Sequence, residues 1–598
     1  MKTSMMLHFR KTAGKVVALL LMLMLPVAGV SQEAVHIPGF YGNSTSLPVI
    51  PSNALPTGGA VASGSAGFEN RFDAAARHPH QLHVHQESEN VIIDWDSFNI
   101  GSEAWTHFDQ QGNAGWKALN RIEDANPSQI YGRLTADGQV YLINANGILF
   151  APGSQVDVHA LVASALNITP DDFLADRMVF TSSDPAFAES HGVVANHGDI
   201  RAQSGGSIFL VGDAVENSGT VSVDFGQLAL VGGDEVEIGF TAQSATNYKN
   251  ILLGDDPGTV LNMHGGLLAT DQGQSGMYGA EVVQNGIIRS VTALRGSGKI
   301  ELVATRRIRT GLDSITAAPI SDSSETILGA EFAGGQIELR VEGGSAESVI
   351  EHEGRILAPS GEVRLEAADR IYLGERSRID VGGSWSIVSS DRSLVTATLN
   401  SQELKDDFLQ KGGILQGAEI QFNSLLGSAI GDVSGSILTV ENTALDQSTG
   451  GGDIFLTASR GDINVREGGV LDFAGGGSIH PSGASNSTLL VSGNRVYDIS
   501  RAPGYLRYNS ILNDQSFLNQ RYGIRRTFEG VYAGGANPVS DFSEGYVQGD
   551  DAGSLTLVAR QLVMDGRLTG GAFTGPYQTE IAGLTNTSGN PASIGTTI

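Results

Sequence analysis

The chain has 598 residues, and its net charge is −28 because 65 acidic residues outnumber 37 basic ones. Cysteine is absent, which excludes disulfide scaffolds, cysteine-ligated zinc, iron–sulfur clusters and thiol nucleophiles. The acidic balance argues against nucleic acid or an anionic membrane surface as the main partner.

The first 31 residues have the pattern of a secretory signal peptide. Basic residues precede an apolar stretch from 16 to 27, and small residues follow it. This stretch is too short for a permanent transmembrane helix, and no later apolar run reaches 18 residues. We therefore expect cleavage between about Gly29 and Gln32, export of the remaining chain, and no permanent transmembrane helix.

Short segments beyond the leader have their own signals. Residues 32–81 are rich in Gly, Ser, Ala and Pro, and are expected to form an N-terminal cap and the first strands. A short helix is predicted over 169–176 with Thr169 as its N-cap. A second helix is predicted over 401–410, ended by the glycine pair at 412–413.

A repeat of 20 to 21 residues follows the first strands. Asn196 recurs as Asn217, and Leu210 recurs as Leu230. Each unit holds two stretches with apolar residues at alternate positions, which is the pattern of strands. The period predicts a parallel β-helix, since the fixed frame of a leucine-rich repeat is missing. Some twenty stacked coils would give a rod on the order of 100 Å long.

One half of the repeat, Gly-x-apolar-x-Leu, recurs at irregular spacing, which indicates insertions between coils. Its copies begin at Gly298, Gly335, Gly361, Gly452 and Gly553. The apolar positions are expected to face a continuous core. The intervening side chains are expected to stay in water, and include Arg201, Glu301, Glu338 and Arg364.

The stretch from 82 to 240 is the most specific part of the chain. It contains, in order, Trp95–Gly101 (WDSFNIG), Leu119–Ile122 (LNRI), Asn126–Gly132 (NPSQIYG) and Asn144–Ile148 (NANGI). Together these segments resemble the haemagglutination-activity, or two-partner secretion, domain of the filamentous haemagglutinin family, closest to its high-molecular-weight adhesin branch. Ala145 stands where that family usually has proline, and we expect the turn to survive because its flanking residues are kept.

The resemblance implies an all-β, right-handed parallel β-helix with an N-terminal cap and extra-helical insertions. It implies export from the periplasm through a cognate outer-membrane β-barrel transporter whose POTRA domains recognise the chain. It also implies a non-enzymatic adhesin or haemagglutinin, secreted or held at the bacterial surface, without a cofactor. Its partners outside would be a host-cell receptor or glycan.

The candidate residues for transporter recognition, or for the fold motif itself, come from the matched segments. They are Asn120, Arg121, Asn126, Pro127, Ser128, Asn144, Asn146, Gly147 and Ile148. Two roles stay open for the asparagines. They either contact the transporter or serve only as turn formers and inward hydrogen-bonded ladders.

The predicted organisation has five parts. They are a signal peptide (1–31), a secretion domain (32–250), continuing repeats with insertions (251–493), an insertion rich in aromatic and arginine residues (494–550), and further repeats (551–598). The insertion is either a unit with its own small core, which is favoured, or a ligand-binding patch. The lack of an obvious C-terminal cap favours a truncated member of a longer protein type.

Other residue groups were weighed for binding or chemistry. Arg460, Gly461 and Asp462 form an integrin-type tripeptide, a candidate receptor contact, at a position where a turn between coils is expected. Histidines cluster between 78 and 85, but without clear ligand spacing for a metal. Asp94, Asp96 and Asp109 are weak candidates for a glycosidase pair, and Gly450–Asp453 resembles half a calcium repeat. Acceptor sequences for glycosylation occur at Asn43, Asn167, Asn486 and Asn586.

Two other classes of function stay open. The chain could be the stalk of a haemolysin or contact-dependent toxin whose effector end is missing. A secreted polysaccharide-active β-helix enzyme is less favoured, because nothing places the acidic residues in a cleft.

Overall fold

The computed structural model describes residues 47–182, 192–241, 244–254, 257–327, 331–342, 347–389, 394–423, 427–437, 442–485, 487–512, 515–519, 524–528, 541–543 and 545–575. The predicted signal peptide, the acceptor sequences at Asn43, Asn486 and Asn586, and residues 576–598 lie outside this part of the chain. Within it, no helix has the length and apolar character needed to cross a membrane.

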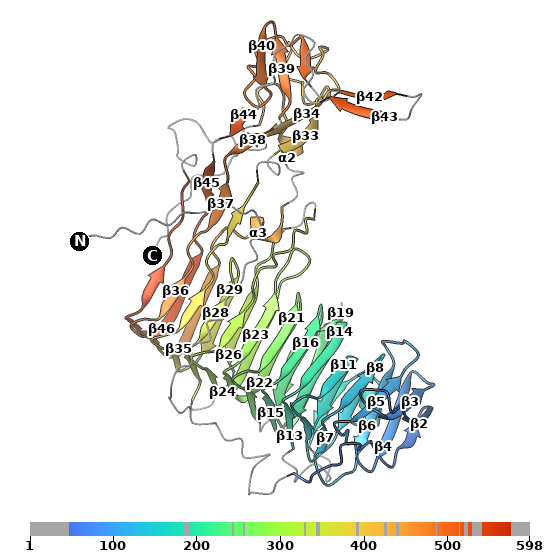
Figure 1. The fold of residues 1–598 in the computed structure, drawn as a ribbon. Coiled ribbons are helices and arrows are strands. Elements are labelled where there is room, and N and C mark those ends of the chain that lie inside the picture. The colour runs from blue at the N-terminus through green and yellow to red at the C-terminus, as the bar shows by residue number, and fades with distance from the viewer. Residues whose placement is uncertain are drawn as a thin grey trace, which may run out of the picture.

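Most of the described chain forms one parallel sheet folded into three ladders, A, B and C (Figure 1). The chain visits the ladders in the order A, B, C and then returns to A one layer further along. Asn196 therefore lies opposite Asn217, and Leu210 lies opposite Leu230, which are the offsets predicted from the repeat.

The strands of each ladder follow one another in chain order. Ladder A holds β7 (Ser128–Ile130), β10 (Ile148–Phe150), β13 (Val193–Asn196), β15 (Ala214–Asn217), β20 (Thr259–Asn262), the second parts of β22 (Gln274–Gln284) and β24 (Lys299–Thr310), β27 (Val349–His352), β30 (Arg370–Leu373), and the second parts of β35 (Asp453–Val465) and β46 (Ser554–Met564).

Ladder B holds β3 (His80–Gln86), β5 (Ala104–Asp109), β8 (Arg133–Ala136), the first parts of β11 (Gln155–Ser164) and β14 (Asp199–Gly212), β16 (Thr220–Asp224), β21 (Leu267–Asp271), β23 (Ile287–Val291), β25 (Ile315–Ala317), β28 (Arg355–Leu357), β31 (Arg378–Asp380), β36 (Val470–Asp472) and β47 (Arg567–Thr569).

Ladder C holds β4 (Asn90–Trp95), β6 (Lys117–Ile122), β9 (Gln139–Ile143), the second parts of β11 and β14, β17 (Gln227–Gly232), the first parts of β22 and β24, β26 (Gln336–Val341), β29 (Glu362–Ala367), and the first parts of β35 and β46.

Two antiparallel strands close the N-terminal ends of ladders B and C. β1 (Ala60–Ser63) pairs with β4, and β2 (Ala66–Phe72) pairs with β3. They cover strand edges that would otherwise be open to pairing with another chain. This pair occupies the place expected of an N-terminal cap.

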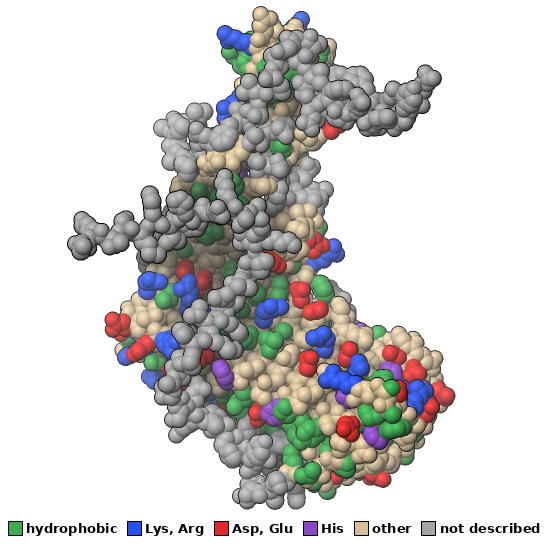
Figure 2. Space-filling view, in the orientation of Figure 1, with side chains coloured by type: hydrophobic (Ala, Val, Ile, Leu, Met, Phe, Trp, Pro, Cys, Tyr) green, Lys and Arg blue, Asp and Glu red, His purple; other side chains and the backbone are tan. Residues whose placement is uncertain are grey.

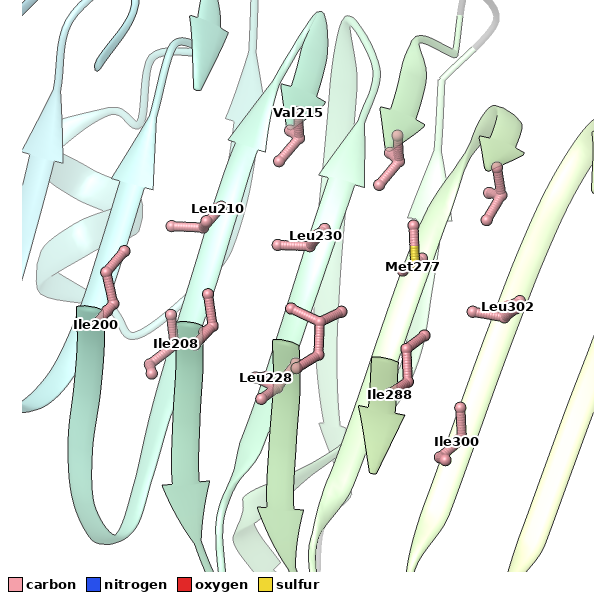
Figure 3. Packing of buried hydrophobic residues seen from close by; sticks show 14 of the residues in the cluster. Ile200, Ile208, Leu210, Val215, Leu228, Leu230, Met277, Ile288, Ile300 and Leu302 are labelled. Carbon is pink, nitrogen blue, oxygen red and sulfur yellow. The ribbon is translucent and has the colours of Figure 1, made fainter. Parts of the chain in front are cut away.

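The core of the ladders is one continuous apolar cluster (Figure 3). Along ladder C, Leu210, Leu230, Met277 and Leu302 lie in register and are fully buried. Each buried aliphatic side chain stabilises the fold by about 1.5–3 kcal/mol relative to exposure. The apolar residues at alternate sequence positions therefore fill the interior of the ladders.

A second apolar cluster lies on the outer face of ladder C. Val162, Phe209 and Val231 point away from the interior and are buried nevertheless. They are covered by α1 (Pro170–Leu174) and by an antiparallel sheet of β12 (Met178–Thr181), β18 (Glu235–Thr241) and β19 (Ser244–Leu253). The predicted helix is confirmed, since the Thr169 side chain accepts a hydrogen bond from the Asp172 N–H.

The remaining elements leave the ladders in two long excursions, over 381–452 and 473–553. They are α2 (Ser434–Ile437), α3 (Ala444–Gln447), β32 (Trp385–Ile387), β33 (Leu394–Thr398), β34 (Glu419–Asn423), β37 (Gly477–His480), β38 (Gly483–Ser485), β39 (Leu489–Ser492), β40 (Arg495–Asp498), β41 (Ser510–Leu512), β42 (Gln515–Asn519), β43 (Ile524–Phe528), β44 (Asp541–Ser543) and β45 (Tyr546–Gly549).

The stack has fewer layers than the sequence predicted, because the two excursions leave it. Ladder B, the longest among the described residues, contains thirteen strands, which span about 60 Å at the usual strand spacing. The expected twenty coils and 100 Å are therefore wrong for the described chain. The difference arises because the two excursions take residues that the estimate had assigned to coils.

The two excursions share a third core, which we call the distal unit. Leu404, Phe422 and Ile430 from the first excursion pack with Leu490 and Tyr508 from the second. Figure 1 shows this unit, with β33, β34, β39 and β40, at the top of the view, where it projects from the C-terminal layers past β37 and β45. The predicted boundary at residue 494 thus falls inside a packed unit, to which β39 already belongs.

Two local predictions are wrong. Residues 401–410 form turns instead of a helix. The Asp407 carboxylate accepts hydrogen bonds from the Leu409 and Gln410 N–H groups, which competes with helical pairing. The prediction that the Glu301 side chain stays in water is the second. Glu301 is buried, and its carboxylate accepts hydrogen bonds from the Tyr278 hydroxyl and the Gln274 amide.

Candidate functional site

The two asparagine-containing segments of the signature meet at one corner of the stack, where ladder C passes into ladder A. The loop 123–127 joins β6 to β7, and the turn 144–147 joins β9 to β10 in the next layer. The turn lies directly against the loop, since the Ser128 N–H donates to the Gly147 carbonyl at 3.0 Å.

Asn144 fastens the two layers together from inside. Its side-chain amide donates to the Asn126 carbonyl at 3.2 Å and to the Ser128 hydroxyl at 3.0 Å. Its side-chain oxygen accepts from the Asn146 N–H at 2.9 Å. Asn144 is fully buried, so each of these bonds replaces one that the amide would make to water.

Asn146 crosses the same corner on the outside. Its side-chain amide donates to the Asp124 carbonyl at 2.9 Å, while the residue stays exposed. The turn closes through the Gly147 N–H, which donates to the Asn144 carbonyl. The turn therefore survives with Ala145 in place of proline, as the flanking residues predicted.

Gly147 is required by both backbone and packing. Its φ is +103°, which side-chain-bearing residues rarely adopt. A Cβ atom there would lie 2.4 Å from the Val193 carbonyl oxygen in the following layer. The next residue, Ile148, is fully buried in the core.

Asn120 makes its hydrogen bonds inside the core and not at the surface. It is fully buried, and its side-chain oxygen accepts a hydrogen bond from the Trp95 indole N–H at 2.9 Å. Its amide donates to the Tyr141 carbonyl of the next layer. The neighbouring Arg121 points outward and forms a two-pronged ion pair with Asp94 at 2.7 and 2.9 Å.

The signature residues thus divide into two groups. Asn120, Ser128, Asn144, Gly147 and Ile148 are buried. Asn126 and Asn146 are exposed, and Pro127 and Arg121 are half-buried. The exposed part forms a small surface that we call the stacked-turn surface, made of Glu123, Ala125, Asn126 and Asn146.

Asp124 is a member of this site that the sequence prediction missed. Its carboxylate accepts from both the backbone and side-chain N–H groups of Asn126, at 2.9 and 3.1 Å. An aspartate two residues before the bonded N–H is the pattern of an Asx-turn, which could have identified it.

The histidine cluster lies on the outer face of ladder B near the cap, where Figure 2 shows charged and histidine side chains gathered. His83 packs against His107 and Trp105, and burial lowers the pKa of His83 and of His107. His85 lies between Glu69 and Asp109, at 3.2 and 3.0 Å. No group able to hold a metal ion occurs among the described residues.

The candidate acids do not converge. Asp94 is held by Arg121, and Asp96 is exposed. The pKa of Asp109 is lowered by the Gln111 backbone N–H, with a further contribution from His85. Asp453, at the end of the calcium-like segment, accepts from the Ser554 hydroxyl at 2.6 Å.

The integrin-type tripeptide lies within the continuous strand β35, where the strand passes from ladder C to ladder A. The turn between coils that was expected at these residues is therefore wrong, since they form part of a continuous strand. Arg460 pairs with Asp369, and Asp462 pairs with Arg370, both in the preceding layer. A Cβ at Gly461 would lie 1.5 Å from the Asp369 carbonyl oxygen, so packing alone requires this glycine.

The comparisons with known proteins concern mainly this N-terminal half. Residues 56–302 match the family model of the TPS secretion domain. Two heme/hemopexin-binding proteins of Haemophilus influenzae are 34% identical over 114 residues and 39% identical over 88 residues, which is 19% and 15% of this chain. The matched segments span 12% and 9% of the length of those relatives.

One solved structure is also similar. The crystal structure of the HMW1 secretion domain from Haemophilus influenzae aligns with 70% of this chain and 95% of its own, at 19% identity and a TM-score of 0.46.

The stacked turns, the capped ladders and the family match agree on the class of the N-terminal part. It is an all-β domain built mainly of parallel strands. Residues 56–302 are a TPS, or two-partner secretion, domain.

Proposed function

We propose that the chain is an exoprotein of a two-partner secretion system. It is exported to the periplasm, bound there by the POTRA domains of a cognate outer-membrane β-barrel transporter, and passed outward to the cell surface or medium. The observation that carries this proposal is the match of residues 56–302 to the TPS secretion domain.

The proposal assigns recognition to the stacked-turn surface. The proposal takes recognition to act on the folded secretion domain, of which the transporter contacts only exposed groups. Among the signature asparagines these are Asn126 and Asn146. The buried members, Asn120 and Asn144, hold the layers in register instead. In this proposal the exposed asparagines contact the transporter, and the buried asparagines have the structural role.

The proposal includes a right-handed parallel β-helix as the exported fold. The parallel pairing of each new layer with the one before supports the β-helix, and its right hand is taken from the family resemblance. Repeat folds of this kind form by nearest-neighbour addition. A chain emerging from a pore can therefore fold layer by layer, and this folding would favour outward movement.

Outside the cell, the proposed role is that of an adhesin or haemagglutinin that contacts a host-cell receptor or glycan. The length of the ladders supports this role, because a stiff body holds a distal surface away from the membrane. Contact through Arg460, Gly461 and Asp462 is the weaker part of the proposal, since ion pairs engage both charged side chains.

The test is secretion in a host with an outer membrane, with and without the cognate transporter. We expect the chain in the medium or on the surface only when the transporter is present. Equal export without it, or retention in the periplasm beside a functional transporter, would contradict the assignment. Binding of the secreted chain to host cells then tests adhesion separately.

A second candidate is binding of haem or hemopexin, which the names of the two curated relatives suggest. Titration of the secreted chain with haemin, followed by the Soret absorption, tests it. A saturable spectral change would favour this role, and an unchanged spectrum up to a tenfold excess of haemin would exclude haem binding.

A further inference from the structure

The distal unit carries a groove that the secretion domain does not explain. The groove has a volume of about 400 Å³ and is open to solvent. Its lining comes from three segments far apart in the sequence, at 403–409, 429–432 and 504–505. A surface assembled from such distant segments is positioned by the fold of the whole unit.

Two aromatic side chains line this groove and are almost fully exposed. Phe408 is 83% exposed and Tyr505 is 79% exposed, the highest values among the aromatic residues whose side-chain burial is described. Covering such rings with a partner is favourable because it removes apolar surface from water. Single exposed aromatics are common on surfaces, but two in one groove are typical of a contact site.

The backbone that holds the two rings is fixed. The buried Gln410 donates its amide to the Leu506 carbonyl at 2.6 Å, which joins the two ring-bearing segments. The third segment is joined through the Asp432 N–H, which donates to the Glu403 carbonyl at 2.8 Å. Leu404 and Ile430 anchor the floor in the core of the unit. The groove is therefore organised before any partner arrives.

The charge of the lining indicates the partner. Glu403, Asp406, Asp407 and Asp432 line the groove, and no lysine or arginine is among its described lining residues. Lys405 lies 3.7 Å from Asp432 and offsets part of this charge. Carboxylates beside aromatic faces favour a cation with an apolar stem, because guanidinium and ammonium groups bind both.

We propose that this groove binds a basic, extended segment of a partner protein. Arginine or lysine side chains of the segment lie against Phe408 and Tyr505, and the carboxylates of the lining accept their N–H groups. Aliphatic residues of the segment cover the apolar floor. The inference names a contact site for the adhesin role proposed above, and its test does not depend on export.

The probe is a fluorescein-labelled nonapeptide of alternating arginine and leucine, titrated with purified full-length chain by fluorescence anisotropy. We expect saturable binding that weakens as salt is raised. Phe408→Ala and Tyr505→Ala should each weaken binding at least about tenfold, as for aromatic anchors. Asp406→Asn should weaken binding about threefold, as expected for an exposed charge pair.

The matched control is Phe72→Ala, because Phe72 is 68% exposed but lies on the cap strand β2. It should bind the peptide as the unchanged chain does. Near-ultraviolet circular dichroism of each variant verifies that the distal unit stays folded. A second control peptide carries glutamate in place of arginine and should not bind.

Three results of the direct binding measurements would each overturn the inference. They are no saturable binding of the arginine peptide, equal binding by Phe408→Ala, and equal binding of the glutamate peptide. Displacement of the peptide by an equal concentration of spermine would assign the groove to a free polyamine and also overturn it. Failure of secretion with an unchanged peptide affinity would contradict the secretion proposal alone.

Discussion

The buried asparagines of the signature segments each make hydrogen bonds inside the ladders, and these bonds explain why asparagine occurs at those positions. The buried Asn120 accepts from Trp95, and the buried Asn144 joins two layers. An unsatisfied buried amide costs about 1–3 kcal/mol, so each such residue fixes one local arrangement. Asn126 and Asn146 extend the same bonded corner to the surface.

His352 is a fully buried histidine whose protonation state depends on pH. It is fully buried in ladder A, with its Nδ1 atom 2.6 Å from the Thr310 hydroxyl. Burial lowers its pKa to about 4, although the Arg378 carbonyl acts in the opposite direction. The unfolded chain therefore takes up this proton at a higher pH than the folded chain does.

We predict that the stability associated with neutral His352 is complete above pH 6.5 and is lost as the pH falls toward 4. The loss amounts to about 3 kcal/mol. The measurement compares unfolding temperatures at pH 7.5 and 4.5 for the unchanged chain and for His352→Gln. The variant should show the smaller decrease, and equal decreases would contradict the assignment.

At the scale of elements, ladder A is fastened by a row of stacked side-chain amides. Asn196 donates to Asn217 at 2.9 Å, Asn217 to Asn262 at 2.8 Å, and Asn262 to Gln284 at 2.7 Å. All four residues are fully buried at the ends of their strands. The row fixes the register of four layers, because a slip of one residue would leave buried amides unpaired.

We predict that Asn217→Ala destabilises this region by about 3 kcal/mol, since it removes two amide bonds and leaves their partners without them. The matched control is Glu216→Ala on the outward side of the same strand, with an expected change within about 0.5 kcal/mol. Urea unfolding, followed by hydrogen exchange of residues 193–287, measures both. Equal effects of the two substitutions would argue against the row as a register lock.

Much of this arrangement could be predicted at the element scale, because repeated elements repeat their residues. The Gly-x-apolar-x-Leu copies at 298, 335, 361, 452 and 553 all fall in ladder C, in register, in spite of the insertions between them. Which asparagines are exposed could not be predicted, since burial depends on how adjacent layers stack.

The excursions were the least predictable elements. Residues 401–410 have a helical pattern of apolar residues, but the Asp407 side chain bonds the backbone locally. The distal unit joins 394–433 with 488–512, and such long-range pairing has no periodic signal in the sequence. Burial of Glu301 likewise depends on Tyr278 in the neighbouring layer.

At the scale of the whole molecule, the described chain contains an apolar core within the ladders and a separate core in the distal unit. The two clusters share no residue, so they need not unfold together. The N-terminal part of the ladders is the secretion domain, and the whole stack of ladders gives the molecule its length. The distal unit contains the aromatic groove.

We predict two thermal transitions by calorimetry. Phe422→Ala removes a fully buried ring from the distal unit and should shift only one transition, by an amount that corresponds to about 3–5 kcal/mol. Leu230→Ala removes a fully buried side chain from the ladders and should shift only the other. A single transition that both substitutions move equally would show that the two cores unfold as one.

The central claim is that the transporter recognises the exposed half of the stacked turns, and one secretion experiment tests it directly. Asn126→Ala/Asn146→Ala is compared with Arg201→Ala/Ser204→Ala, which alters two exposed residues of β14 in the same domain. Export is measured beside the cognate transporter, and the unfolding temperature of each purified variant is measured in parallel.

We predict that the asparagine variant keeps the unfolding temperature of the unchanged chain but accumulates in the periplasm, while the β14 variant is secreted normally. Asn144→Ala should lose both stability and export. Normal secretion of the asparagine variant, or an export defect that only follows a fall in its unfolding temperature, would contradict the account.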